Sequence, residues 1–425
     1  MQSLFQIPET IENYLAELDD FIDTQIKPLE EEDDNIRFFD HRREHSRTDW
    51  DAGGLPREDW EMLLAEARRC ADEAGHFRFQ LPEEFGGQNG GNLAMARIRE
   101  HFAAKGLGLH NDLQNEHSIV GNLVQPLMVR DFGTQSQKQF IEPMCRGEML
   151  WSFGLTEEEH GSDATWMKTR AARHRKDGVS GWLINGEKMW TTGLHVATHV
   201  MCFARHSGED GSARGIGCFV VDTEAKGFSV GEYMWTFNMP TDHPKCSFRD
   251  VFVPDEMVLG DLDFGLACAQ HFVHENRIRQ AASSLGAAQY CIDESVKYAK
   301  ERAPFGKPLW LNQAIQFPLV ELQTEAEMLR LLIYQTAHAM DGMSKTEVAK
   351  RLTDKVSMCN YRANRLVCEA ADRAMQVHGG LGYSRHKPFE HIYRHHRRYR
   401  ITEGSEEIQM RKIAAVMFGK IQTGK

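Results

Sequence analysis

The chain has 425 residues, a formal net charge of −12, 41% hydrophobic residues and 26% charged residues. A chain of this length exceeds one ordinary domain and predicts two or three domains with sizeable cores. The composition excludes an intrinsically disordered chain. The acidic balance argues against a general nucleic-acid binder and against adhesion to anionic membranes.

The nine cysteines are odd in number and form no CxxC pair, so we expect reduced thiols rather than a disulfide framework. No apolar run approaches the roughly 18 residues that a membrane-spanning helix needs. The N-terminal stretch "MQSLFQIPETIENYLAELDD" carries acids where a transit peptide has arginines, and the terminal "QTGK" is not a peroxisomal address. These features predict a cytoplasmic, bacterial protein.

Residues 1–150 predict an N-terminal helical domain. In residues 11–31, and again in residues 58–74, apolar side chains recur along one helix face. Residues 31–58 are densely charged and aperiodic, which indicates an exposed excursion. The glycines of residues 81–91 predict a loop.

Residues 151–265 predict a central β domain. The dipeptide Asn185-Gly186 stands between two short runs, which is the pattern of a tight hairpin. Strands are expected at His199–Arg205, at Gly215–Val221 and in the alternating stretch 245–254.

Residues 266–425 predict a C-terminal helical bundle. Long helical patterns rich in alanine and leucine cover residues 277–303, 320–340 and 345–378. The order of the chain is therefore helices, then strands, then helices. That order excludes a doubly wound nucleotide-binding fold, in which strands and helices alternate throughout.

The stretch "RHHRRYRITEGSEEIQMRKIAA", residues 394–415, places one acid between a basic run and a predicted helix. Ser405 is a good N-cap, and Glu406 and Glu407 suit the positive end of the helix dipole. Glu403 then lies just outside the helix. It is either a third acid that favours the helix start or a carboxylate with a function.

Other motifs predict structure rather than chemistry. The glycines of "HGGLGY", residues 378–383, follow a helix and no strand, which indicates a helix C-cap and a tight loop. His391 and His395 are four residues apart but lack a thiolate or acid at ligand spacing, so no metal site is predicted. Neither a nucleophile elbow nor a phosphate-binding loop is present.

Three polar stretches, residues 153–169, 187–193 and 301–313, lie in otherwise apolar surroundings. Taken singly, each predicts a turn or a packing aromatic. Taken together, their order and spacing show that the chain from about residue 10 to 420 resembles the acyl-CoA dehydrogenase family. The resemblance implies a mainly α fold with an N-terminal helical domain, a central β-barrel and a C-terminal four-helix bundle, with FAD between barrel and bundle.

The resemblance assigns several residues to the flavin. The family's T-E-x-x-x-G-S-D motif matches residues 156–163, which implies that Thr156 hydrogen-bonds the flavin ring. Ser162 would lie near the FAD pyrophosphate or the CoA portion. The family's W-I-T motif matches Trp190 and Thr192, which places the indole against the isoalloxazine and the hydroxyl near flavin N5.

Two further family motifs, E-R-x-x-F-G-K with a later glutamine and Q-x-x-G-G-x-G-Y, match through Arg302, Phe305, Gln313, Gln376, Gly379 and Gly380. In relatives, residues of both motifs reach the FAD of a neighbouring subunit. The resemblance therefore implies a homodimer or homotetramer. It also implies an acyl-CoA substrate and an electron-transfer flavoprotein as electron acceptor.

Glu403 aligns with the family's catalytic carboxylate in Y-E-G-T and is the expected base. Ser405 keeps a hydroxyl that can serve the cofactor, and Glu407 is also expected on the cofactor side. Arg277 falls on the family's arginine near the base, and its 25-residue interval to Arg302 matches the family's. Asn276 stands where one subgroup carries its base, and an amide cannot abstract a proton.

The implied reaction removes the α-proton of an acyl thioester while the β-hydrogen leaves as hydride to flavin N5, giving a trans-2-enoyl thioester. Ser162, Arg277 and Gly404 are expected on the substrate side, and Gly404 allows a tight turn. The helix dipole (~0.3–1 kcal/mol) and the arginines lower the pKa of Glu403, whereas full burial raises a carboxyl pKa by up to ~3–5 units. We therefore expect burial to dominate.

Two alternatives stay open: a flavin-dependent oxidase or monooxygenase of the same fold, and a non-catalytic flavin-binding relative. The presence of Glu403 and Arg277 and the net negative charge favour the dehydrogenase. Glu158 and Glu159 stand where relatives often have a proline and a small residue. The length, branching or ring content of the acyl group is not predicted.

Overall fold

The computed structural model describes residues 6–111, 118–121 and 124–420. The chain packs as two compact units. The helical unit comprises Met1–Glu44, Asn89–Gly121 and Val273–Lys425, and the sheet unit comprises His45–Gln88 and Asn122–Phe272. Residues 1–5 and the terminal QTGK, which bear on the expectation about targeting, lie outside the described residues. The three-domain division at residues 150 and 265 stays a prediction.

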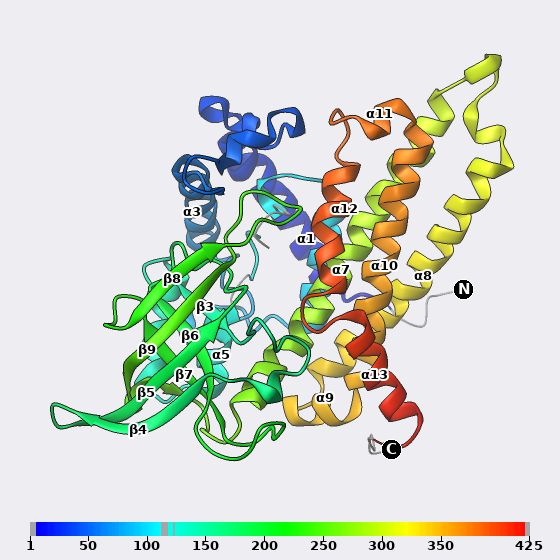
Figure 1. Cartoon of the computed structure of the whole chain (residues 1–425). Coiled ribbons are helices and arrows are strands. Elements are labelled where there is room, and N and C mark those ends of the chain that lie inside the picture. The colour runs from blue at the N-terminus through cyan, green and yellow to red at the C-terminus, as the bar shows by residue number, and fades with distance from the viewer. Residues whose placement is uncertain (1–5, 112–117, 122–123, 421–425) are drawn as a thin grey trace. The chain divides into compact units, whose positions relative to one another are not determined.

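The helical unit is organised around α10 (Thr353–His378), which packs against α8 (Gln313–Asp341), α12 (Phe389–Arg397) and α13 (Glu406–Met417). Figure 1 shows α8 and α10 running beside α7 (Gly265–Glu301), which enters this unit at Val273. The remaining helices of the unit are α1 (Glu9–Phe21), α2 (Lys27–Glu31), α4 (Asn92–Ala104), α9 (Lys345–Arg351) and α11 (Gly380–Tyr383).

Small side chains let these helices approach one another closely. The shared core is rich in alanine, as at Ala281 and Ala363, and in leucine, as at Leu285. A Cβ on Gly286 of α7 would lie 2.2 Å from the carbonyl oxygen of Glu100 on α4, so only glycine fits that helix crossing. The predicted helical bundle is confirmed.

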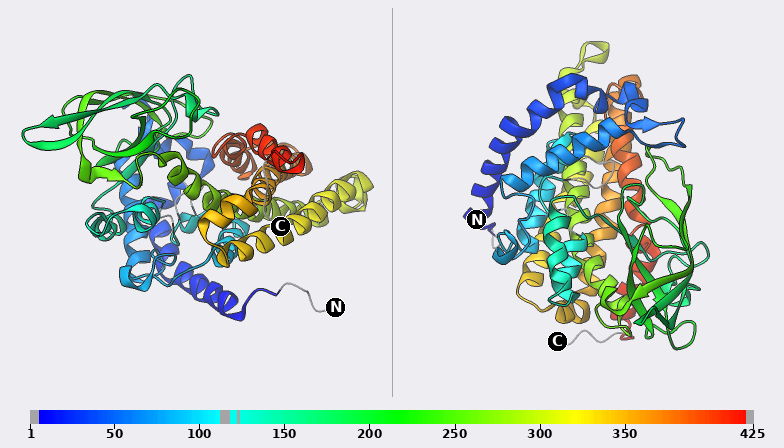
Figure 2. Two further views of the ribbon diagram at one scale, coloured as in Figure 1. Left: turned by 90° about the horizontal axis from the view of Figure 1, so that it is seen from below. Right: turned by 90° about the vertical axis from the view of Figure 1, so that its left-hand side faces the viewer.

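The sheet unit holds one curled, mostly antiparallel sheet (Figure 2). The strand order is β10-β7-β6-β4-β5-β9-β8, and β3 pairs in parallel with β6. The strands are β3 (Trp151–Gly154), β4 (Arg170–Lys176), β5 (Val179–Lys188), β6 (His199–Arg205), β7 (Ile216–Asp222), β8 (Phe228–Tyr233), β9 (Pro244–Pro254) and β10 (Val258–Leu259). The unit also contains the hairpin β1 (Thr48–Asp49) and β2 (Leu55–Pro56), and the helices α3 (Glu58–Glu73), α5 (Val124–Phe132) and α6 (Ile141–Cys145).

Strands β6, β7 and β9 lie where the sequence predicts them. Nearly every residue of β6 and β7 is buried, as expected of central strands made of consecutive apolar residues. The predicted class, helices on either side of a central β segment in the chain, is confirmed.

The predicted hairpin at Asn185-Gly186 is wrong. Both residues lie inside β5, where the pairing with β9 shifts register between Ile184 and Gly186, and the actual turn is Asp177-Gly178. A Cβ on Gly186 would lie 2.6 Å from the Cα of Thr169. This glycine therefore serves a close approach at a bulge rather than a turn.

The charged segment 31–58 is not a simple excursion. It contains two 3₁₀ turns and the β1–β2 hairpin, and Phe38 and Thr48 are buried. The expected helix over 345–378 is divided into α9 and α10 at Leu352, whose φ of −119° and ψ of 4° are not helical. The start of α9 is set by the capping box of Ser344 and Glu347.

All nine cysteines are free thiols, as predicted. Among the described residues, none of the helices is both long enough and apolar enough to cross a membrane.

Candidate active site

Glu403 lies on the turn between the 3₁₀ turn η11 (Arg398–Arg400) and α13. Its φ is 56°, and Gly404 follows with a φ of 84°, so two successive residues adopt the left-handed conformation. The hydroxyl of Ser405 accepts a hydrogen bond from the backbone N–H of Ile408 at 3.5 Å. The predicted N-cap is confirmed, and Glu403 stands outside the helix as expected.

Arg277 of α7 holds the backbone of this turn. Its Nε and Nη2 donate to the carbonyl oxygen of Glu403 at 3.0 and 2.5 Å. A Cβ on residue 404 would lie 3.0 Å from Nη2 of Arg277, so glycine leaves room for the guanidinium. Burial lowers the pKa of Arg277 to about 10, opposed by the charge of Glu403, and the guanidinium stays positive at neutral pH.

Buried amides complete the support of the turn. Nε2 of Gln409 donates to the carbonyl oxygen of Gly404 at 2.8 Å and to Oδ1 of Asn360 at 2.9 Å. Nδ2 of Asn360 donates to the carbonyl oxygen of Arg277 at 3.0 Å. The carboxylate itself accepts a hydrogen bond at Oε1 from Nδ2 of Asn276, at 2.8 Å.

Sequence reasoning missed Gln409 and Asn360, and treated Asn276 only as a group unable to act as base. A signal was available on α10, where Asn360 and Asn364 are four residues apart among alanine and leucine. Asn364 Nδ2 donates to Asn360 Oδ1 at 3.1 Å, so the two amides form one buried polar row.

Two arginines of the basic run, residues 394–400, pair with acids other than Glu403. Arg400 and Arg365 of α10 each donate two hydrogen bonds of 2.9–3.0 Å to the carboxylate of Glu406. These bonds lower the pKa of Glu406 to about 2. Arg394 pairs with Glu390 at 2.6 Å.

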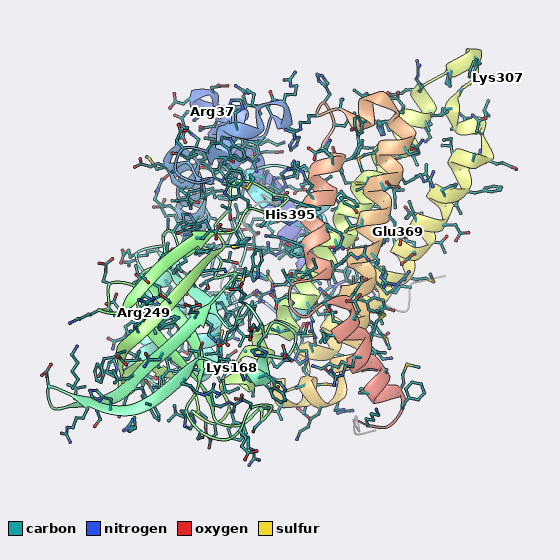
Figure 3. The ribbon with its side chains drawn as sticks, viewed as in Figure 1. Arg37, Lys168, Arg249, Lys307, Glu369 and His395 are labelled. Atoms are coloured by element: carbon teal, nitrogen blue, oxygen red, sulfur yellow. The ribbon has the colours of Figure 1, made fainter. Side chains whose placement is uncertain are left out.

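Two histidines belong to the basic run. His395 and His396 are buried on α12, where Figure 3 marks His395. His395 Nε2 contacts the hydroxyl of Tyr399 at 3.1 Å. No group of three potential metal ligands occurs among the described residues.

In the sheet unit, a buried ion pair links the segments of Thr156 and Trp190, both of which were expected to face the flavin. Lys188, 1% exposed, donates from Nζ to Oε1 of Glu157 at 2.8 Å and to the carbonyl oxygen of Leu155 at 3.1 Å. The backbone N–H of Met189 donates to the carbonyl oxygen of Thr156 at 2.9 Å. The segments of Thr156 and Trp190 are therefore brought together.

Trp190 and Thr192 present an aromatic face and a hydroxyl at the surface of the sheet unit. The indole is 44% exposed, and Trp190 has a φ of 63°. The hydroxyl of Thr192 lies 3.1 Å from Nδ1 of His243, which lies 3.0 Å from Oδ1 of the buried Asp242. No pattern in the sequence singles out His243 and Asp242.

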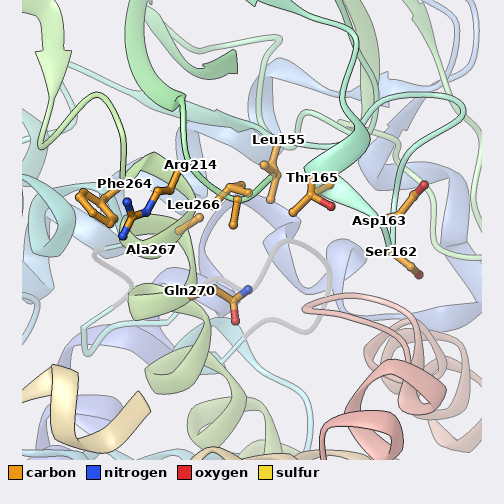
Figure 4. Close-up of a pocket in the computed structure, with 12 residues that line it drawn as sticks. Leu155, Ser162, Asp163, Thr165, Arg214, Phe264, Leu266, Ala267 and Gln270 are labelled. Carbon is orange, nitrogen blue, oxygen red and sulfur yellow. The ribbon is translucent and has the colours of Figure 1, made fainter. Parts of the chain in front are cut away.

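A cavity of about 530 Å³ lies in the sheet unit next to Ser162. Figure 4 shows Arg214 and Phe264 at one end of its wall and Ser162 and Asp163 at the other. The guanidinium of Arg214 lies 5.7 Å from the ring centroid of Phe264. The cavity thus combines a cation, hydroxyl groups and an apolar floor that includes Leu155 and Leu266.

Seven predicted residues remain, all exposed and all in the helical unit. Glu407 lies in the first turn of α13. The other six are Arg302, Phe305, Gln313, Gln376, Gly379 and Gly380. They lie on the hairpin between α7 and α8, whose tip Figure 3 marks at Lys307, and around the start of α11. Figures 1 and 2 show that the hairpin and α11 lie at the same end of the bundle. The turn of Glu403, which Arg277 holds, lies far from this end, because α7 rises about 36 Å from Arg277 to its last residue, Glu301.

The chain matches three domains of one family: the acyl-CoA dehydrogenase N-terminal domain at residues 34–148, the middle domain at 152–251 and the C-terminal domain at 263–418. It is 34% identical over 347 residues to the 3-(aryl)acrylate reductase of Clostridium sporogenes, covering 80% of this chain and 87% of that protein. It is 31% identical over 350 residues to the caffeyl-CoA reductase-Etf complex subunit CarC of Acetobacterium woodii, covering 81% and 88%.

A solved structure of glutaryl-coenzyme A dehydrogenase in a glutaryl-CoA complex aligns with a TM-score of 0.79 at 26% identity, covering 99% of this chain and 98% of that one. The fold and these matches define an enzyme of the oxidoreductase class. The chain belongs to the acyl-CoA dehydrogenase family. FAD is the cofactor of this family. The expected family, fold class and cofactor are confirmed.

Proposed function

We propose that this protein oxidises an acyl-CoA thioester to the trans-2-enoyl-CoA, with Glu403 as the base that takes the α-proton. The observation that carries the proposal is the fixed turn of Glu403. Arg277 holds its carbonyl oxygen, and Asn276 holds one carboxylate oxygen at 2.8 Å. A carboxylate that only favoured a helix start would not need a buried guanidinium and a buried amide to hold it.

The exposed groups of the sheet unit fit a flavin ring. A flat indole and a hydroxyl stand at the surface on one short segment, Trp190–Thr192. Backbone hydrogen bonds from Thr191 to Pro244 and from the next residue, Gly193, to Asp242 anchor this segment. Trp190 would lie against the isoalloxazine, and Thr156 and Thr192 would hydrogen-bond its polar edge. When bound, FAD supplies the acceptor for the hydride that leaves the β-carbon. In the helical unit, Ser405 and Glu407 would lie on the cofactor side of the turn.

The chain's own groups would handle the proton. Removing water from around Glu403 strengthens it as a base, and a thioester oxygen that accepts hydrogen bonds stabilises the charge that develops as the α-proton leaves. Two N–H groups of Arg277 donate to the backbone carbonyl oxygen of Glu403 and so fix the turn that carries the base. Gly404 would leave room for the acyl chain beside the base.

The cavity beside Ser162 would receive part of the CoA moiety. A cation such as Arg214 suits a phosphate, and the hydroxyl of Ser162 suits the amides of the pantetheine arm. Glu158 does not add a free negative charge there, since it pairs with Lys245 at 2.8 Å.

Three observations support a homodimer or homotetramer. Arg302 directly follows α7, whose last residue, Glu301, lies about 36 Å along the helix from Arg277, so the bundle end of one chain is well placed to serve the FAD of another chain. The glycines there suit a dinucleotide, because a Cβ on Gly379 or Gly380 would meet no atom within 4 Å. In addition, one face of α8 exposes the apolar residues Phe317, Val320, Met328 and Leu331, each more than half exposed.

An electron-transfer flavoprotein is the proposed electron acceptor. The name of the relative from Acetobacterium woodii includes an Etf complex. A second candidate function is the reverse reaction, because two relatives carry the name reductase. In that direction Glu403 would return the proton to the α-carbon.

Anaerobic titration with straight-chain, branched and aryl acyl-CoAs tests the proposal. At least one substrate should bleach the flavin absorbance. Glu403→Gln should retain FAD and bleach at least about a thousandfold more slowly, the order expected for loss of a general base. Equal rates in variant and wild type would refute the role of Glu403. Bleaching only by dithionite, followed by reoxidation with an enoyl-CoA, would favour the reverse reaction.

A further inference from the structure

Asn276 contacts the carboxylate of the proposed base, Glu403, but does not hold the backbone of the turn on which Glu403 lies. It lies one residue before Arg277 on α7 and is 7% exposed. Its Nδ2 donates to Oε1 of Glu403 at 2.8 Å. The carboxylate can only accept, so the NH₂ end of the amide faces it.

The backbone of the turn is fixed without Asn276. The carbonyl oxygen of Glu403 is held by Arg277, and that of Gly404 is held by Gln409. Asn360 connects the two supports, because it accepts from Gln409 and donates to the carbonyl oxygen of Arg277. Removing the amide of Asn276 therefore leaves these three side chains and their hydrogen bonds in place, and removes only the hydrogen bond to the carboxylate.

The charged groups around the turn come from four described elements. Arg277 of α7 faces Glu403 directly, and Lys412 of α13 lies near Arg277. Arg365 of α10 and Arg400 of η11 are both neutralised by Glu406. Burial lowers the pKa of Lys412 to about 8, so Lys412 titrates well above the pH range of a carboxylate.

We infer that Asn276 is a positioning residue that holds the carboxylate of Glu403 in one orientation and favours its charged, proton-accepting form. The inference rests on the proposed function, in which Glu403 is the base. A hydrogen bond donated to the charged form of an acid stabilises that form. Glu403 is half-buried in the structure, so the amide counteracts the further loss of water around the carboxylate that bound flavin and acyl-CoA would cause.

The test is the pH dependence of kcat/KM, measured with the acyl-CoA of the panel that bleaches the flavin fastest. In the acid limb of this profile, kcat/KM falls with decreasing pH as the base becomes protonated. Asn276→Ala should move that limb to higher pH by about one unit. At pH values within the limb kcat/KM should then be about tenfold lower than in wild type, and at higher pH it should change little. Asn276→Asp keeps the size of the side chain but puts a second carboxyl beside the first. It should move the limb further upward.

Asn360→Ala is the matched control, a buried asparagine of the same network that does not touch the carboxylate. It should lower kcat/KM by a similar factor at every pH and leave the limb in place. An unshifted limb in both Asn276 variants would overturn the inference while Glu403 remains the base. Wild-type bleaching by Glu403→Gln would overturn the proposed function itself, so the two failures are distinguishable.

Discussion

The buried pair of Lys188 and Glu157 allows a quantitative prediction about the sheet unit. Lys188 is almost completely buried and contacts Glu157 at 2.8 Å. Burial works against ionisation, but the charge of Lys188 and hydrogen bonds from residues 168 and 169 hold the pKa of Glu157 below its usual range. Lys188→Met would keep most of the side-chain volume and leave a buried carboxylate without its counter-ion.

Breaking a buried ion pair on one side costs about 3–5 kcal/mol. For a unit of this size, each kcal/mol corresponds to about 2–4 °C in melting temperature. We therefore expect a drop of roughly 6–20 °C, measured by differential scanning calorimetry at pH 7. FAD affinity should fall as well, since Leu155 and Glu157 flank Thr156.

Lys226→Met, at an exposed lysine of the same unit, is the matched control and should change the melting temperature by less than about 2 °C. The double variant Lys188→Met/Glu157→Gln should recover part of the loss, because it removes the uncompensated charge. A Lys188→Met protein that melts within 2 °C of wild type would refute the reasoning, since such a shift corresponds to about 1 kcal/mol or less.

Three further predictions concern the helical unit. In the folded protein the pKa of Glu406 is about 2, against a usual 4.5. Its ion pairs therefore stabilise the protein above pH 4.5, and this stability is lost as the pH falls toward 2. Glu406→Gln should have a lower melting temperature at pH 7, and its melting temperature should depend less on pH below 4.5. Burial lowers the pKa of His396 to about 3, so the unfolded chain binds a proton below pH 6.5 that the folded chain excludes. Stability should fall as the pH drops from 6.5 to 5, by up to about 1.4 kcal/mol per pH unit, and His396→Asn should reduce that slope in thermal melts. Met328→Lys on the exposed face of α8 should lower the sedimentation coefficient by dissociating the proposed oligomer, whereas Val179→Lys, at an exposed residue of the sheet unit, should not. An unchanged sedimentation coefficient in the α8 variant would exclude that face as an interface.

Helix and strand positions followed from the sequence where the hydrophobic period was strong. Strands β6 and β7 are runs of buried apolar residues, and α3 has a clear apolar stripe, so each could be predicted. The Asn185-Gly186 dipeptide was misleading because the same two residues that favour a hairpin also suit a bulge. The choice between hairpin and bulge is decided by the close contact between Gly186 and Thr169, the residue that precedes β4. This tertiary contact cannot be read from the sequence around Gly186.

Only part of the candidate site could be predicted from the sequence. Ser405 as N-cap and Glu403 outside the helix follow from local helix rules. The partners of Glu403 come from 126 and 127 residues away, at Arg277 and Asn276. The ion pairs of Glu406 could not be predicted either, because Arg400 and Arg365 of α10 meet the same carboxylate only in the folded chain.

Exchange of the substrate α-proton with solvent tests the central claim most directly. A 3-thia-acyl-CoA, incubated with the enzyme in D₂O, reports proton removal without requiring the hydride step. Wild type should incorporate deuterium at the α-carbon, and Glu403→Gln, with its FAD retained, should do so at least about a thousandfold more slowly. Equal deuterium incorporation by the two proteins would contradict the assignment of Glu403 as the base.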